Sequence, residues 1–379
     1  MLGTAKGRAI AIQVLVVAIV AAALYVVGTA TAANLKAKGI PLGWDFLFRP
    51  AGFQIAETIL PYSPRDPNWW AAVVGIANSL FVSVLVVFFA SLLGLAIGIA
   101  RLSPNPLVRG TARCWVEVAR NTPVIVLLIF TYSIWWKLLP QSTEAWDLGP
   151  GTHLSLRGLV LPAIRWEGAA WLWWMVLAWI AIILAAARVA AWRQAVTGVR
   201  PPFVLASVAG GLLILGAAAL SASDGIMVEF AEYRRGNFFG GWQITPELTT
   251  ILVGLTFYTA GFIGEIVRGG ILAIPRGQWD AARALSLRRG QIYRLVVVPQ
   301  ALRAIVPPLN SQYINVVKNS TLAIAVGYQD FMTVMGTVIN RTSHAIEGIV
   351  MILGVFLVLN LALSSLMNWY NRRIAIVER

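Results

Sequence analysis

The chain has 379 residues, of which 58% are apolar and only 12% are charged, whereas about 25% are charged in an ordinary soluble domain. This composition excludes soluble classes such as dinucleotide-binding enzymes and nucleic-acid-binding modules, and it indicates a polytopic membrane protein. We attribute the net charge of +14 to basic residues in loops that stay in the cytoplasm.

A bilayer core of about 30 Å requires about 20 apolar residues per helix. Eight stretches of the sequence qualify, namely 9–33, 72–100, 117–139, 169–190, 203–221, 246–270, 301–323 and 346–370. The first is too long for a signal peptide and lacks its cleavage site, so we expect a retained helix. The seventh is the weakest, because it contains Pro307, Pro308 and Lys318. The predicted fold class is all-α, with about eight transmembrane helices.

The charges of the loops orient these spans. With the N-terminus inside, 19 of the 30 basic residues fall in inner segments and 12 of the 16 acids fall outside. Cytoplasmic loops of membrane proteins are rich in Lys and Arg. We therefore predict that both termini are cytoplasmic.

The same spans divide the chain into four segments. Residues 1–71 form an N-terminal helix and an ordered or semi-ordered, proline-rich outer loop. Residues 72–140 and 246–379 form the two parts of a five-helix core. Residues 141–245 hold polar outer loops and an inserted helix pair, which we expect at the periphery because it lacks a polar stripe.

The inner loop 273–300 is amphipathic and helix-prone. Its small apolar face consists of Ala281, Ala282, Ala284 and Leu285, and its basic face of Arg283, Arg288 and Arg289. Residues 286–290 interrupt the pattern. A helix–turn–helix of this kind is suited to dock in a groove of a soluble partner, although it could instead lie on lipid.

This loop resembles the EAA motif of ATP-binding-cassette importer permeases, which reads E-A-A, three residues, Gly, nine residues, Ile-x-Leu-Pro. It is matched here by Asp280-Ala281-Ala282, Ser286, Val296 and Val298-Pro299. Asp280 replaces the family's Glu, and Ser286 replaces its Gly. A residue with a β-carbon pays about 1–2 kcal/mol for left-handed backbone angles. Either the turn at Ser286 is therefore not left-handed, or Gly290 takes over part of the bend.

Further motifs narrow the resemblance to polar amino acid permeases of the histidine/glutamine type. They are Arg120-Asn121-Thr122-Pro123, Glu265-Ile266-Val267-Arg268-Gly269-Gly270 and Lys318-Asn319-Ser320-Thr321-Leu322. The resemblance covers roughly 72–139 and 246–370. The additional spans are similar to those of the larger members, which serve general L-amino acid or glutamate/glutamine/aspartate/asparagine uptake.

The resemblance implies a membrane subunit of an ATP-driven importer that takes up L-amino acids from the periplasm. The implied partners are a cytoplasmic ATPase dimer, a second, related permease (a heterodimer rather than a homodimer) and a periplasmic amino acid binding protein. ATP and magnesium would bind to the ATPase subunits, and this chain would hold no cofactor, no metal and no nucleic acid. The implied coupling residues are Asp280, Ala281, Ala282, Arg283, Ser286 and Gly290.

Polar residues inside a membrane usually face a cavity or a partner. On the seventh span, Pro307, Ser311, Asn315 and Lys318 share one helical face, which Asn310 flanks. We predict that this face, together with Thr122, lines the translocation path, where Lys318 could meet a substrate carboxylate. The alternative is a lysine that is held near the outer surface by helix ends or snorkels to it.

Two other function classes remain to be weighed. An ion-coupled carrier needs acids at mid-membrane, where Glu265 is the one candidate, and its spacing from Arg268 favours a local ion pair. A membrane enzyme needs a catalytic constellation. The sequence has one cysteine, two distant histidines and no phosphate-binding P-loop, so any ATP must bind to another chain.

Overall fold

The computed structural model describes residues 5–39, 41–166, 226–234 and 236–374. Between 166 and 226 it describes only the pieces 178–179, 181–183, 185–186, 188–190, 193, 207–212 and 216. The chain divides into two compact units. One combines Met1–Lys137 with Glu247–Arg379, and the other is Leu138–Pro246. The predicted spans 169–190 and 203–221 lie mostly outside the described residues.

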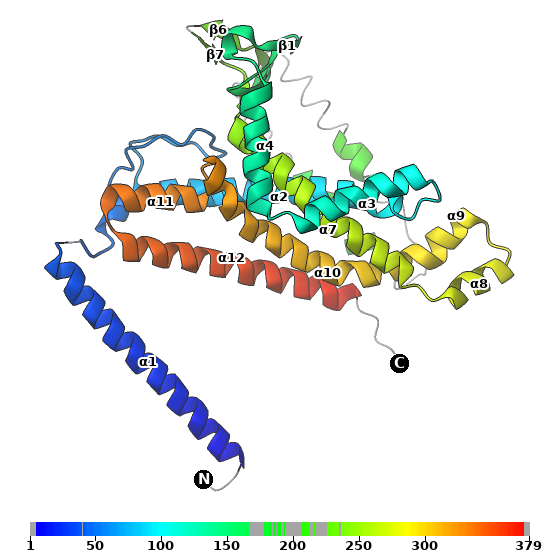
Figure 1. The fold of residues 1–379 in the computed structure, drawn as a ribbon, viewed down its shortest axis with the longest axis horizontal. Helices are drawn as coiled ribbons and strands as arrows, with labels where there is room; N and C mark the ends of the chain where they lie inside the picture. The colour runs from blue at the N-terminus through cyan, green and yellow to red at the C-terminus, as the bar shows by residue number, and fades with distance from the viewer. Residues whose placement is uncertain are drawn as a thin grey trace. The chain divides into compact units, whose positions relative to one another are not determined.

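The first unit is helical. Its α-helices are α1 (Ala5–Ala37), α2 (Asn68–Ala100), α3 (Pro106–Asn121), α4 (Val124–Leu138), α7 (Pro246–Leu272), α8 (Arg276–Ala284), α9 (Arg289–Gln291), α10 (Val298–Asn319), α11 (Phe331–Thr342) and α12 (Ala345–Ile374) (Figure 1). Shorter helical turns are η1 (Asp45–Phe48), η4 (Ile292–Val297) and η5 (Ser320–Val326). Among the described residues, five helices are long and apolar enough to cross a membrane, and the pair α3–α4 would add a sixth. A mostly helical, polytopic fold is thus confirmed.

The predicted continuous span 117–139 is wrong. Helices α3 and α4 meet at Thr122–Pro123 with a bend of 111°. Proline disfavours helical angles in the residue before it, and Thr122 is extended, with φ −102° and ψ 129°. The apolar pattern continues across this break, so the sequence predicted one span where the structure has two helices.

The predicted seventh span 301–323 is longer than expected. The helix runs from Arg289 to Val326 and passes through Pro299 instead of ending there. Proline removes one N–H donor and crowds the carbonyl four residues earlier. Here that carbonyl belongs to Leu295, which lies in the wider turns of the π-helix η4.

Glycines bring α2 and α7 into close contact. A β-carbon at Gly94 would lie 2.6 Å from the Ile263 side chain, and one at Gly98 would lie 2.7 Å from that of Val267. Small residues four positions apart allow two membrane helices to approach this closely. The backbones of α2 and α7 therefore form one packed pair that the other helices of the core extend.

The proline-rich segment that was predicted as an outer loop is ordered over 41–67, and hydrogen bonds hold it to the helices. The Gly43 amide donates to the Glu347 carboxylate over 2.7 Å, and the Asn68 amide group donates to the carbonyl of Phe46 over 2.9 Å. Phe46 is fully buried and stacks on His344, with ring centroids 4.5 Å apart. The prediction of an ordered loop is confirmed for this segment.

The second unit contains β-strands where the sequence indicated polar loops. Strands β1 (Trp146–Gly149), β2 (Thr152–Ser155), β3 (Gly158–Leu161) and β8 (Trp242–Ile244) form one antiparallel sheet in that order. Strand β4 (Ala163–Trp166) pairs with β5 (Ile226–Glu229), and β6 (Glu232–Arg234) pairs with β7 (Asn237–Phe239).

A small buried cluster of Val160, Ala231 and Phe238 holds the strands of this unit together. Gly158 is required at its position, because its φ is +120° and a β-carbon would lie 2.2 Å from the Ile244 carbonyl oxygen. The strands are three or four residues long, too short for their alternation to stand out in the sequence.

Candidate coupling loop and translocation path

The coupling loop, residues 273–300, folds as two helical segments packed on each other. Helix α8 contacts η4, and the Trp279 ring meets Tyr293 edge-on with centroids 5.4 Å apart. Ala282 is only 3% exposed and belongs to the same buried cluster as Ile292 and Val297. The loop is therefore packed on the same buried core as α2, α3, α7 and α10.

The prediction that Ala282 shares an outward apolar face with its neighbours is therefore wrong. Ala281 and Ala284 are exposed, and the side chain of Leu285 is 75% exposed. Ala282 instead points into the packing between α8 and η4, where its small size allows the close approach. The outward surface of α8 is formed by Ala281, Ala284 and Leu285 together with the exposed pair Asp280–Arg283, whose charged atoms lie 3.4 Å apart.

The turn after α8 is left-handed at Ser286, where φ is +55°. The Ser286 amide donates to the Arg283 carbonyl over 2.8 Å, and the Leu287 amide donates to the Ala282 carbonyl over 3.3 Å. This pair of bonds is a Schellman motif, which ordinarily places glycine at the position of Ser286. Both alternatives left open by the sequence are excluded, because Gly290 lies within α9 and has no positive φ.

The predicted polar face of α10 is left uncovered by the described residues. Pro307, Ser311, Asn315 and Lys318 are all exposed, whereas Val316 and Val317 on the opposite side are 1% and 4% exposed. Lys318 forms no ion pair with any residue in the described part of the chain. Placing a polar stripe with one charged residue in contact with lipid costs free energy, so another protein surface or water must cover it.

Two residues predicted for the path lie apart from this stripe. Asn310 is 7% exposed and buried on the inner side of α10. Thr122 is half-buried at the bend between α3 and α4. The structure thus brings together Ser311, Asn315 and Lys318, and it places Asn310 and Thr122 elsewhere.

Glu265 forms the predicted ion pair with Arg268 and a second one that the sequence did not indicate. The Glu265 carboxylate receives Arg268 Nη2 at 2.5 Å, and it also pairs with Arg101, the first residue after α2. One carboxylate therefore joins the C-terminal ends of α2 and α7 directly before residues 273–300. The local ion pair is confirmed, and substrate contact is not needed to explain Glu265.

Sequence reasoning also missed a buried acid at the start of α11. Asp330 is 1% exposed and begins α11 as its N-cap, with Oδ1 accepting from the Thr333 amide over 2.9 Å. Its Oδ2 has no hydrogen-bond partner, and burial raises the pKa of Asp330 to about 6 although the bonds from Thr333 lower it. The sequence signal was an Asp followed three residues later by Thr at a helix start, and that signal marks a cap without revealing its burial.

The described residues include no group of three or more His, Cys, Asp or Glu side chains that could hold a metal ion. Cys114, the one cysteine, is exposed and free. The polar features described above are the ion pairs of Glu265 with Arg101 and Arg268, the stripe on α10, the buried Asp330 and the surface of the loop. None of them combines a nucleophile with a base.

Comparison with known proteins agrees with these features. Residues 90–376 match the family "Binding-protein-dependent transport system inner membrane component". The putative amino-acid ABC transporter permease YhdX of Escherichia coli is 41% identical over 92% of this chain and 89% of its own length. The general L-amino acid permease AapQ of Rhizobium johnstonii is 39% identical over 99% of this chain and 94% of its own length. The glutamate/glutamine/aspartate/asparagine permease BztB of Rhodobacter capsulatus is 38% identical over 98% of this chain and 95% of its own length.

 

The resemblance to amino acid permeases, drawn from the motifs, is confirmed by these three relatives. Because the family pattern covers most of the chain, the chain belongs to the family of inner-membrane components of binding-protein-dependent transport systems.

Proposed function

We propose that this chain is a permease subunit of an ATP-binding-cassette importer that takes up L-amino acids from the periplasm. The observation that carries the proposal is the uncovered stripe Ser311–Asn315–Lys318 on α10. A transported amino acid always has a carboxylate, and a lysine that answers it would serve many substrates. The names of AapQ and BztB describe broad amino acid transport, which supports the same substrate class.

The stripe also supports an assembly with a second permease. The described residues leave this polar face open, so a second membrane subunit across it would enclose a path between two such faces. We infer a related but different permease as that subunit, in keeping with the larger members that the sequence resembles. A periplasmic amino acid binding protein would deliver substrate, and both termini would lie in the cytoplasm.

The coupling loop would meet the ATPase dimer, which binds ATP and magnesium, through the outward surface of α8. Ala281, Ala284 and Leu285 offer an apolar surface on a short helix that is braced from behind by η4. Such a helix can enter a groove of a soluble partner. The Glu265 pairs with Arg101 and Arg268 would carry movement of the loop to the inner ends of α2 and α7.

An ion-coupled carrier is disfavoured by the state of Glu265. Two arginines hold this carboxylate, so it is not placed to exchange protons with a substrate path. Uptake that depends on ATP, in vesicles without an ion gradient, would separate the two functions.

The test is uptake of labelled amino acids by proteoliposomes that contain the complete transporter and enclosed ATP. We expect ATP-dependent uptake, and we expect Lys318→Met to lower uptake of every substrate at least tenfold while protein levels stay normal. The matched control is Lys137→Met, which removes another exposed lysine, at the end of α4. Uptake without ATP, or normal uptake by Lys318→Met, would contradict the proposal.

A further inference from the structure

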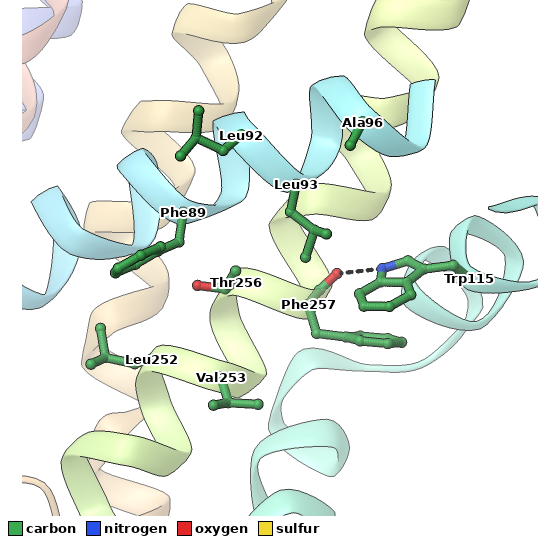
Figure 2. Close-up of a pocket in the computed structure, with 9 residues that line it drawn as sticks. All are labelled: Phe89, Leu92, Leu93, Ala96, Trp115, Leu252, Val253, Thr256 and Phe257. Carbon is green, nitrogen blue, oxygen red and sulfur yellow. Dashed lines mark hydrogen bonds between the residues drawn. The ribbon is translucent and has the colours of Figure 1, made fainter. Parts of the chain in front are cut away.

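An open apolar groove lies between α2, α3 and α7. It has a volume of about 650 Å³, and nine side chains line it (Figure 2). Thr256 is the one hydroxyl among them, and Phe89, Leu92 and Val253 are 48%, 55% and 53% exposed. The described residues of the chain do not fill this groove, so its occupant must be apolar.

The groove is held open by a rigid wall. The Trp115 indole N–H donates to the Phe257 carbonyl over 3.2 Å, and the two rings stack with centroids 4.3 Å apart (Figure 2). On the other side, Gly94 and Gly98 fix α2 against α7. A wall fixed on both sides does not collapse to fill the space, which favours a resident ligand over an incidental gap.

The groove lies close to one end of α2. Ala96 is the last residue of α2 along the chain that lines the groove, and Arg101 follows directly after the helix. At 1.5 Å per residue, Arg101 lies about 8 Å further along the axis. An apolar chain in the groove would therefore end beside the positive charges at that end of the helix.

Those charges form a cluster with an excess of arginine. Burial, and after it the charges of Arg268, Arg113 and Arg120, lower the pKa of Arg101. Arg101 therefore lies within electrostatic range of these three arginines. Glu265 forms ion pairs with Arg101 and Arg268, and Glu117 forms one with Arg113 over 2.7 Å.

Arg120 remains without an ion pair among the described residues. Its guanidinium carbon lies 5.8 Å from the centre of the Phe262 ring, and its side chain is exposed. Four arginines against two carboxylates leave a site where an anion would relieve repulsion.

We propose that this groove binds an anionic phospholipid, with an acyl chain along Leu93 and Phe257 and the phosphate beside Arg101 and Arg120. Apolar surface that leads into a basic cluster at a membrane helix end matches the two halves of such a lipid. A zwitterionic lipid would satisfy the groove without relieving the repulsion among the arginines. A helix of a neighbouring subunit would need acidic residues at one end to do both.

The test counts lipid retained by the purified, complete transporter in detergent, by native mass spectrometry after titration with phosphatidylglycerol or phosphatidylcholine. We expect saturable binding of phosphatidylglycerol and at least fivefold weaker binding of phosphatidylcholine. Arg120→Gln should weaken the binding of phosphatidylglycerol about fivefold, since one arginine contributes about that factor near a membrane surface. Ala96→Trp, which fills the groove from an exposed position, should abolish it.

The matched control is Arg303→Gln, which removes an exposed arginine from α10 and should leave binding unchanged. Equal loss from Arg120→Gln and Arg303→Gln would show a non-specific surface attraction and overturn the proposal. Retention of phosphatidylglycerol by Ala96→Trp would do the same. If the transporter retained no lipid and Leu92→Cys formed a disulfide with another subunit, the groove would be a protein interface. That result would also overturn the proposal. Because the assay measures bound lipid, these outcomes do not bear on the proposed transport function.

Discussion

The coupling loop and the stripe on α10 differ in whether other residues of the chain cover their motif residues. The loop closes on itself, because Ala282 fills a gap between α8 and η4 and Ser286 completes the cap of α8. The stripe stays open, with Ser311, Asn315 and Lys318 uncovered along an otherwise apolar helix. The loop's motif residues therefore stabilise the loop itself. The polar face of α10 is uncovered within the described chain, so it must meet a neighbouring subunit or water.

The largest expected effect separates two adjacent alanines of the loop. Ala282→Glu would bury an unpaired charge and should destabilise the loop by about 3–5 kcal/mol. Ala281→Glu alters only the outward surface, so the loop should stay folded while uptake is uncoupled from ATP hydrolysis. Limited proteolysis of the loop and paired assays of uptake and ATP hydrolysis would measure both. Equal proteolysis of the two variants would show that Ala282 is not enclosed.

The next effect concerns Asp330, whose buried carboxylate destabilises the fold when it is charged. It lies between η5 and α11, outside the candidate spans. Its pKa is about 6 in the folded protein and 3.8 ordinarily, so the folded state holds the proton more tightly. Stability should fall as pH rises from about 4 to 6, by about 3 kcal/mol in all, and stay low above that range.

Asp330→Asn keeps a side chain that caps helices equally well and removes the charge. We expect this variant to unfold at a higher temperature than the parent protein at pH 7.5 and at the same temperature near pH 4. Thermal unfolding in detergent across this range would measure the difference. A lower unfolding temperature for Asp330→Asn at pH 7.5 would show that the charge stabilises the fold.

The smallest effect concerns the turn after α8. Ser286→Gly should stabilise the loop by about 1 kcal/mol, because glycine adopts the left-handed angles without strain. Gly290→Ala serves as the comparison: Gly290 has helical geometry and open space around its β-carbon position, so alanine should be accepted there. Hydrogen exchange at the Leu287 amide would report the change. Faster exchange in Ser286→Gly would contradict the Schellman assignment.

The sequence was informative where one local signal sufficed. Apolar length located α2, α7 and α12 within a few residues. It was less informative where two signals competed. Pro123 breaks a helix pattern that Pro299 and Pro307 do not break, and the difference depends on the turns around each proline.

Contacts between distant segments could not be predicted from one sequence. The pairing of Arg101 with Glu265 joins residues 164 positions apart, and the burial of Asp330 depends on packing that the sequence does not display. The short strands of the second unit were missed because each carries too few residues for a period to be seen. The stripe on α10 was found from its helical spacing, although Asn310 proved to lie on the buried side.

The most direct test of the central claim measures which side of α10 meets water. In a Cys114→Ser background, single cysteines would replace Ser311, Asn315, the buried Val317 and Leu357, which is 60% exposed on α12. Only thiols in contact with water ionise and react readily with a charged thiol reagent. We predict that Ser311→Cys and Asn315→Cys in the complete transporter react and that substrate amino acids slow the reaction, while the other two stay unreactive. Reaction at Leu357→Cys, or none at Ser311→Cys and Asn315→Cys, would contradict a water-filled substrate path along this stripe.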